Sequence, residues 1–273
     1  YTTIFPNPIG MSASFDRDMI KQAGKVTGTE ARALYERSGG GGLCLWAPTI
    51  DMERDPRWGR TEEGYGEDPF LTGEMAGAYV QGIQGEDADC LLAGATVKHF
   101  YANNVEEGRT YKSSEIEERD KEEYYLEPYR RVIGQYGAIG MMTAYNSING
   151  IPAIVNPEIQ FRAKDEWGLV HAVCDGGDML QTVEEHHYFT EHADTVAAAL
   201  KAGLDCFTDD QKEVIRAAKK AYEDGRITEE DIDRALRCHF RVMFRLGLFT
   251  PEPDRKYKDT GMEKVACKEH LEI

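Results

Sequence analysis

Short apolar runs alternate with amphipathic stretches along most of the chain. Five runs have the length and flanking residues of buried parallel strands, at residues 42–46, 95–100, 138–144, 170–174 and 204–208. Apolar residues recur at helical spacing between most of them, at residues 70–83, 115–133 and 190–202. This alternation predicts an α/β fold with a parallel sheet, because parallel neighbours need a crossover connection.

The number of these units favours a barrel. Eight strand-helix units close a (β/α)8 or TIM barrel, and this chain shows six or seven. Residues 211–248 differ, since they predict charged helices without a strand between them. No proline- or serine-rich linker divides the 273 residues. We therefore predict one TIM-barrel-like domain over residues 1–250.

Charge and hydropathy exclude several classes of partner. The formal net charge of −17 disfavours nucleic acid and anionic membrane surfaces, which are bound by clustered Lys and Arg. No apolar run approaches the roughly 20 residues of a membrane span. The chain starts at Tyr1 without a signal-like segment, and its six cysteines show no metal-like spacing. Unpaired thiols favour a reducing, cytoplasmic compartment, with secretion as the alternative.

Polar side chains of unusual type follow each predicted strand. Lys98 and His99 end the second strand, with Arg109 in the loop beyond it, and Tyr145 follows the third. Asp175 follows the fourth and precedes a Gly-Gly pair. Parallel strands of a barrel end on one face, so we expect these side chains to share one pocket. Such a mixture suits a ligand rich in hydroxyl groups.

Asp175 is the strongest candidate for chemistry. The Gly-Gly turn leaves space beside it, and a carboxylate in that position can attack an anomeric carbon to form a glycosyl ester. An Asp at this position can instead cap the following helix. The cations expected nearby, Lys98, Arg60 and Arg109, exceed what a cap requires and favour the first interpretation.

Five short motifs, in order, resemble the catalytic barrel of family 3 glycoside hydrolases. They are DPRWGR at 55–60, GEDP at 66–69, KHF at 98–100, YN at 145–146 and CDGG at 174–177. The resemblance runs from about residue 5 to residue 249. It implies that Asp175 is the nucleophile. It also implies that the sugar-binding residues are Arg60, Glu63, Lys98, His99, Arg109 and Tyr145, with Glu62 a weaker candidate.

The resemblance implies a retaining, exo-acting β-glycosidase of β-xylosidase or β-glucosidase type, acting on plant-derived oligosaccharides. The chain starts after the family's first strand, so the barrel is expected to be incomplete at its N-terminus. Residues 251–273 are expected to begin a linker or helix toward a second α/β domain or a subunit that completes the site. In most members that domain carries the acid/base. Glu106 and Glu107 are the weak local substitutes, because charged loop residues are usually only solvated.

Two other functions stay open at this point. Lys98 at a strand end could form a Schiff base in an aldolase-type enzyme, with His99 as proton shuttle. The chain could also be a non-catalytic carbohydrate-binding barrel, or a fragment that is inactive because it lacks its acid/base. Nothing in the sequence requires a metal ion or an organic cofactor.

Overall fold

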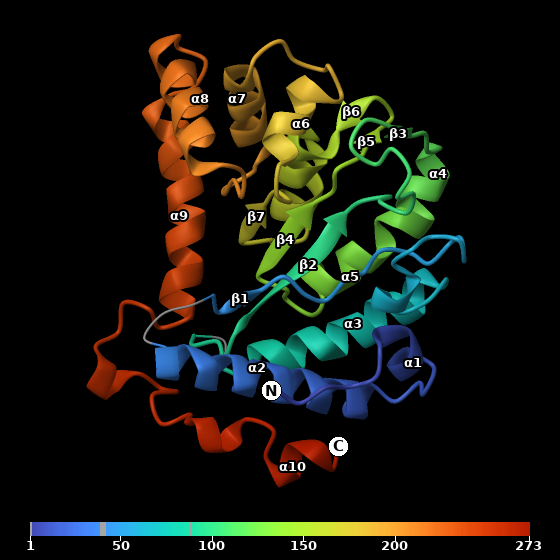
Figure 1. Cartoon of the computed structure of the whole chain (residues 1–273), viewed down its shortest axis with the longest axis vertical. Helices are drawn as coiled ribbons and strands as arrows, with labels where there is room; N and C mark the ends of the chain where they lie inside the picture. Colours follow the sequence, from blue (N-terminus) through green and yellow to red (C-terminus); the bar gives the residue numbers. More distant parts are fainter. Residues whose placement is uncertain (1, 39–41, 88) are drawn as a thin grey trace.

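The computed structural model describes residues 2–38, 42–87 and 89–273 (Figure 1). The α-helices are α1 (Pro8–Ser12), α2 (Arg17–Ser38), α3 (Pro69–Gln84), α4 (Glu118–Asp120), α5 (Glu127–Gly134), α6 (Asp178–Glu184), α7 (His192–Ala202), α8 (Gln211–Glu223), α9 (Glu229–Arg245) and α10 (Lys268–Leu271). The strands are β1 (Cys44–Leu45), β2 (Gly94–Phe100), β3 (Ser113–Ser114), β4 (Gly140–Thr143), β5 (Ser147–Ile148), β6 (Ile151–Pro152) and β7 (His171–Val173). The 3₁₀ and π helices are η1 (Thr61–Glu63), η2 (Lys121–Tyr125), η3 (Ala153–Val155), η4 (Ile159–Glu166), η5 (Glu252–Asp254) and η6 (Met262–Lys264).

Four parallel strands form the centre of the molecule in the order β1-β2-β4-β7. A parallel bridge between Val173 and Cys206 continues this order beyond β7. The strands thus follow one another around the sheet in chain order, with helices between them, as in a TIM barrel. The prediction of an α/β barrel-type fold is confirmed. A small second sheet, β3-β5-β6, lies above the end of β4 (Figure 1).

Most predicted elements are present, and the differences have local causes. Residues 204–208 contribute a single bridge instead of a full strand. The helix predicted over 115–133 is divided into α4, η2 and α5. Pro128, at the start of α5, cannot donate a backbone hydrogen bond to the preceding turn, which separates α5 from the π turn before it.

The long helix α2 was not predicted, because polar and small residues dominate it. It packs closely along α3, and glycines make this approach possible. A β-carbon at Gly24 would collide with the Tyr79 carbonyl, and one at Gly82 would collide with the Lys21 carbonyl. The backbones of the two helices therefore touch, and α3 is held against β2.

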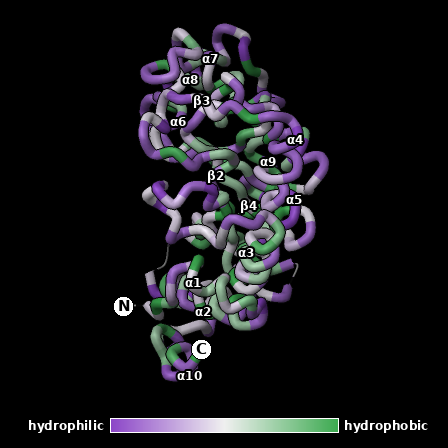
Figure 2. Tube along the Cα trace, turned by 90° about the vertical axis from the view of Figure 1, so that its right-hand side faces the viewer, coloured by the Kyte–Doolittle hydropathy of each residue, from purple (hydrophilic) through white to green (hydrophobic). Residues whose placement is uncertain are grey.

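Apolar segments gather around β2 and β4, and polar ones lie at the periphery (Figure 2). Residues 251–273 lie along the outer side of α2, where His270 Nδ1 is 2.9 Å from Glu30 Oε1 and Arg255 Nη1 is 3.2 Å from Glu36 Oε2 (Figure 1). That these residues lead to another domain stays a prediction, as does the cytoplasmic location. Among the described helices, none combines the length and apolar character needed to cross a membrane.

Candidate active site

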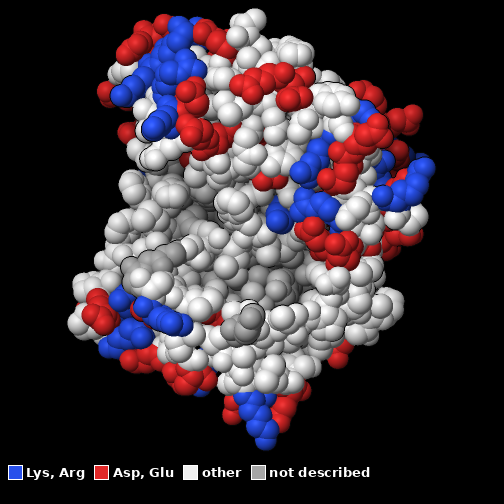
Figure 3. All heavy atoms as spheres, viewed as in Figure 1, with Lys and Arg blue, Asp and Glu red and all other residues white. Residues whose placement is uncertain are grey.

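The predicted site residues come from the ends of three parallel strands and from the loop after β1. Lys98 and His99 lie near the end of β2, Tyr145 follows β4, and Asp175 follows β7. On the face shown in Figure 3, basic and acidic side chains lie side by side over the region where β2 ends, beside a hollow with few charges. The structure therefore gathers these residues at one edge of the sheet, as the barrel prediction requires.

Asp175 and His99 face each other across the site. His99 Nε2 lies 3.7 Å from Asp175 Oδ2, and both side chains are mostly buried. The other oxygen of Asp175 accepts a 2.8 Å hydrogen bond from the backbone N–H of Gly176. Oδ2 thus stays available to a ligand, with His99 beside it.

The ring of His99 is held by Asp51, a residue to which the sequence analysis gave no role. Asp51 Oδ2 accepts from the backbone N–H of His99 at 3.1 Å and lies 2.8 Å from Nδ1. An ionised carboxylate only accepts hydrogen bonds, so we assign the imidazole proton to Nδ1. Nε2 then accepts from Arg60 Nη1 at 3.4 Å and points toward Asp175. In the sequence, Asp51 follows an apolar segment that ends at the site, and this position could have indicated a role for it.

Arg60 and Glu63 form a bidentate ion pair at the edge of the site. The guanidinium donates to the two carboxylate oxygens at 2.6 and 2.7 Å, and Thr49 Oγ1 donates to Glu63 at 3.2 Å. Its hydrogen bonds from Arg60 lower the pKa of Glu63. Glu63 is therefore an ionised hydrogen-bond acceptor and is poorly suited to donate a proton to a leaving group.

Lys98 lines a cavity on the side of the site where Glu63 lies. This cavity has a volume of about 610 Å³ and is also lined by Glu62, Glu63 and Trp46, next to residues near the start of the chain. Its ammonium contributes to lowering the pKa of Glu63. The structure therefore places Lys98 close to the Arg60–Glu63 pair.

Tyr145 and Arg109 form the opposite wall. The phenol of Tyr145 donates to the Gly176 carbonyl at 2.9 Å, and burial followed by the charge of Asp175 raises its pKa. The guanidinium carbon of Arg109 lies 4.8 Å from the centre of the Tyr145 ring. Tyr145 therefore remains a neutral donor close to Asp175.

Glu106, one of the two local substitutes for an acid/base, is engaged on this wall. It accepts from Trp58 Nε1 at 2.8 Å and lies 3.1 Å from Arg109 Nη1. These contacts fix both the loop and the guanidinium. The described contacts indicate that Glu106 positions Trp58 and Arg109. They do not identify a residue that donates a proton to a leaving group.

The comparison with known families decides the identity. The family described as "Glycosyl hydrolase family 3 N terminal domain" matches residues 1–242. The chain belongs to this family. The resemblance inferred from the motifs is therefore confirmed.

Relatives of this family 3 domain include proteins that are named as glycosidases. It is 37% identical to "Probable beta-D-xylosidase 7" of Arabidopsis thaliana over 286 residues, covering 98% of this chain and 36% of the relative. A solved GH3 exo-beta-xylosidase (XlnD), bound to a xylobiose aziridine probe, has a TM-score of 0.91, 28% identity and coverage of 97% and 35%. A beta-glucosidase from Listeria innocua, in complex with glucose, has a TM-score of 0.87, 30% identity and coverage of 100% and 37%. The chain thus spans about a third of the length of these relatives.

Two further acids lie next to the turn that carries Asp175 in this family 3 domain. Asp178 is buried at the start of α6 and accepts from Thr143 Oγ1 at 2.8 Å. Burial raises its pKa well above the usual range. Asp209 accepts from the backbone N–H of Leu180 at 3.2 Å. Asp178 thus connects the start of α6 to β4, and Asp209 connects α6 to the segment after residue 208.

A buried glutamate in the loop after β1 gives a prediction about pH. Burial raises the pKa of Glu53 to about 7, against a weaker opposing effect of the Gly64 backbone N–H. The folded protein thus retains a proton there that the unfolded chain loses near pH 4.5, so this group lowers stability as pH rises from about 4.5 to about 7. We expect Glu53→Gln to increase the free energy of unfolding by about 2 kcal/mol above pH 7, measured by urea titration.

The matched control is Glu86→Gln, because that side chain is 90% exposed. It should leave the pH dependence unchanged. If Glu53→Gln also leaves the urea midpoint unchanged above pH 7, then Glu53 titrates as an ordinary surface carboxyl.

Proposed function

We propose that this domain carries the nucleophile of a retaining β-glycosidase of β-xylosidase or β-glucosidase type. Family 3 membership and the named relatives support this class of activity. The observation that carries the proposal is the approach of Asp175 Oδ2 to His99, whose ring Asp51 holds in place. A terminal sugar of a plant-derived oligosaccharide is the proposed substrate.

The residues suit a two-step displacement. Asp175 Oδ2 attacks the anomeric carbon while the bond to the leaving oxygen breaks, giving a glycosyl ester. Water then attacks that carbon and returns the carboxylate, with net retention of configuration. Tyr145 lies beside the nucleophile, where its phenol can stabilise the oxocarbenium-like transition state.

The sugar hydroxyl groups would form hydrogen bonds with several charged and polar side chains of the site. Arg60 and Glu63 offer a donor and an acceptor fixed to each other, and His99 Nε2 lies between Arg60 and Asp175. Lys98 and Arg109 line adjoining parts of the site. Such fixed partners bind hydroxyl groups at little entropic cost.

The leaving oxygen needs a proton, and we propose that a second domain or subunit supplies the acid. Glu63 is held ionised by Arg60, and Glu106 is engaged by Trp58 and Arg109. Removal of an acid/base costs on the order of 10²–10⁴-fold for leaving groups that need protonation. The isolated chain is therefore expected to cleave aryl glycosides of acidic phenols far better than alkyl glycosides.

Covalent trapping tests this proposal. We expect dinitrophenyl 2-deoxy-2-fluoro-β-xyloside or its β-glucoside analogue to leave one glycosyl adduct on Asp175, identified by peptide mass spectrometry. The leaving group requires no acid, and the fluorine slows hydrolysis of the ester. The reagent that forms the adduct more rapidly would identify the preferred sugar. An adduct on another residue, or none from folded protein, would contradict the assignment of Asp175 in this chain.

Neither alternative function gains support from the structure or the relatives. In an aldolase, Lys98 would form a Schiff base with a keto substrate, and borohydride would reduce it to a stable adduct. We expect no such adduct. A purely carbohydrate-binding barrel would bind the fluoro-glycosides without releasing dinitrophenol.

A further inference from the structure

Two histidines and a cysteine lie together where β7, the segment beside it and α9 meet. His171 is the first residue of β7, Cys206 lies on the neighbouring segment that bridges Val173, and His239 lies on α9. One ligand atom from each of the three residues lies within 4.8 Å of the other two. The residues are far apart in sequence, which is why their spacing along the chain shows no metal motif.

The two imidazoles have the separation of zinc ligands. His171 Nε2 and His239 Nδ1 lie 3.3 Å apart. Zinc binds imidazole nitrogen at about 2.0–2.1 Å in tetrahedral geometry, so two nitrogens on one ion lie about 3.3–3.4 Å apart. The Cys206 sulfur needs only a small movement to complete a three-ligand site.

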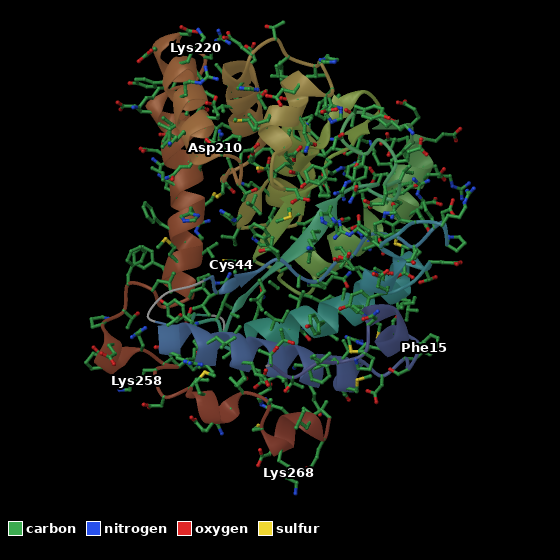
Figure 4. The ribbon with its side chains drawn as sticks, in the orientation of Figure 1. Phe15, Cys44, Asp210, Lys220, Lys258 and Lys268 are labelled. Atoms are coloured by element: carbon green, nitrogen blue, oxygen red, sulfur yellow. The ribbon has the colours of Figure 1, made fainter. Side chains whose placement is uncertain are left out.

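The surroundings favour a borderline-soft cation. The nearest strong charges cancel, because Lys164 Nζ lies 2.6 Å from Asp205 Oδ1 in a buried ion pair. Cys44 also interacts with Cys206 and lies beside α9 in Figure 4. Two imidazoles and a thiolate select zinc over magnesium or calcium, which prefer oxygen ligands.

We propose that His171, Cys206 and His239 bind one Zn²⁺ ion, with water at the fourth position, and that the ion fastens α9 to β7. Zinc binds cysteine as the thiolate, so binding of zinc by a protonated Cys206 releases one proton. The proposal does not rest on the proposed glycosidase activity, because none of these three residues is among those assigned to that activity.

Titration of metal-free protein with Zn²⁺ tests the proposal, with Co²⁺ as the spectroscopic probe. We expect one ion per chain, a micromolar or tighter Kd, and a thiolate-to-cobalt charge-transfer band in the near ultraviolet. His239→Gln should weaken zinc binding by roughly 10²-fold or more. Cys206→Ser should abolish the charge-transfer band. The control is His187→Gln, because His187 lies in an exposed turn and contacts the Val183 carbonyl.

Zinc should also raise the Tm of the native chain and of His187→Gln, but not that of His239→Gln. The proposal fails if folded native protein binds no zinc, or if His239→Gln and Cys206→Ser bind it as tightly as the native chain. It also fails if cobalt binds without the charge-transfer band, because the metal then lies away from Cys206. Circular dichroism of each variant establishes that a loss of binding is not a loss of fold.

Discussion

Asp175→Asn is expected to lower kcat on dinitrophenyl β-xyloside or β-glucoside by on the order of 10⁴-fold or more. The amide keeps the shape of the side chain but cannot form a stable glycosyl ester. Because the carboxylate is only partly exposed and its Oδ1 already accepts from Gly176, the substitution should change the fold little. Steady-state kinetics with an activated leaving group measure the loss without requiring an acid/base.

The matched control for this prediction is Asp210→Asn. Asp210 starts α8 (Figure 4), where its Oδ1 accepts from the backbone N–H groups of Lys212 and Glu213 at 3.0 and 3.1 Å. Asparagine caps helices as well as aspartate does, so this variant should keep native activity. Azide should rescue Asp175→Gly and give a glycosyl azide of inverted configuration. Native activity in Asp175→Asn would exclude Asp175 as the nucleophile.

Asp51→Asn is expected to have the second largest effect, a drop in kcat/KM of roughly 10²-fold. Asp51 acts through His99, because its carboxylate holds both the ring and the backbone of that residue. The amide removes the negative charge and can present N–H groups to Nδ1, which moves the imidazole proton to Nε2. That proton would compete with the hydrogen bond from Arg60.

Nitrogen NMR of the His99 ring provides a measurement that a structural defect alone would not change. We expect Nδ1 protonation in the native chain and Nε2 protonation in Asp51→Asn. The control is Asp55→Asn in the same loop, since Asp55 pairs with exposed Arg57 and lies outside the contacts of His99. An unchanged tautomer together with full activity would remove Asp51 from the site.

The sequence predicted the barrel well where periodicity and chemistry agree. The run at 95–100 differs from β2 by one residue, the run at 170–174 contains β7 with one extra residue at each end, and Asp175 follows as expected. The helix α2 was not predicted, because it packs against α3 through glycines such as Gly24. These glycines permit the contact because they have no side chain that would collide with the other helix. A contact made through glycines does not add to the periodic pattern of apolar residues, so that pattern does not predict it.

The sequence predicted most of the residues that lie in the candidate site, but it did not predict which of them contact each other. Grouping of the polar residues at strand ends follows from parallel topology, so His99 and Asp175 could be expected close together. Which carboxylate orients His99, and which partner holds Glu63, depend on loop conformations between residues 49 and 66. The cluster of His171, Cys206 and His239 needed the position of α9, which no local pattern specifies.

The single carboxylate oxygen of Asp51 that binds both the ring and the main chain of His99 has a further consequence. Rotation of the imidazole and displacement of the end of β2 are mechanically linked, so neither can fluctuate freely without breaking the other contact. The conformational entropy of this side chain is consequently lost when the protein folds. Under the proposed function, a sugar would therefore bind to an imidazole that is already immobile, and its binding energy would remain available for distortion of the sugar ring toward the transition state.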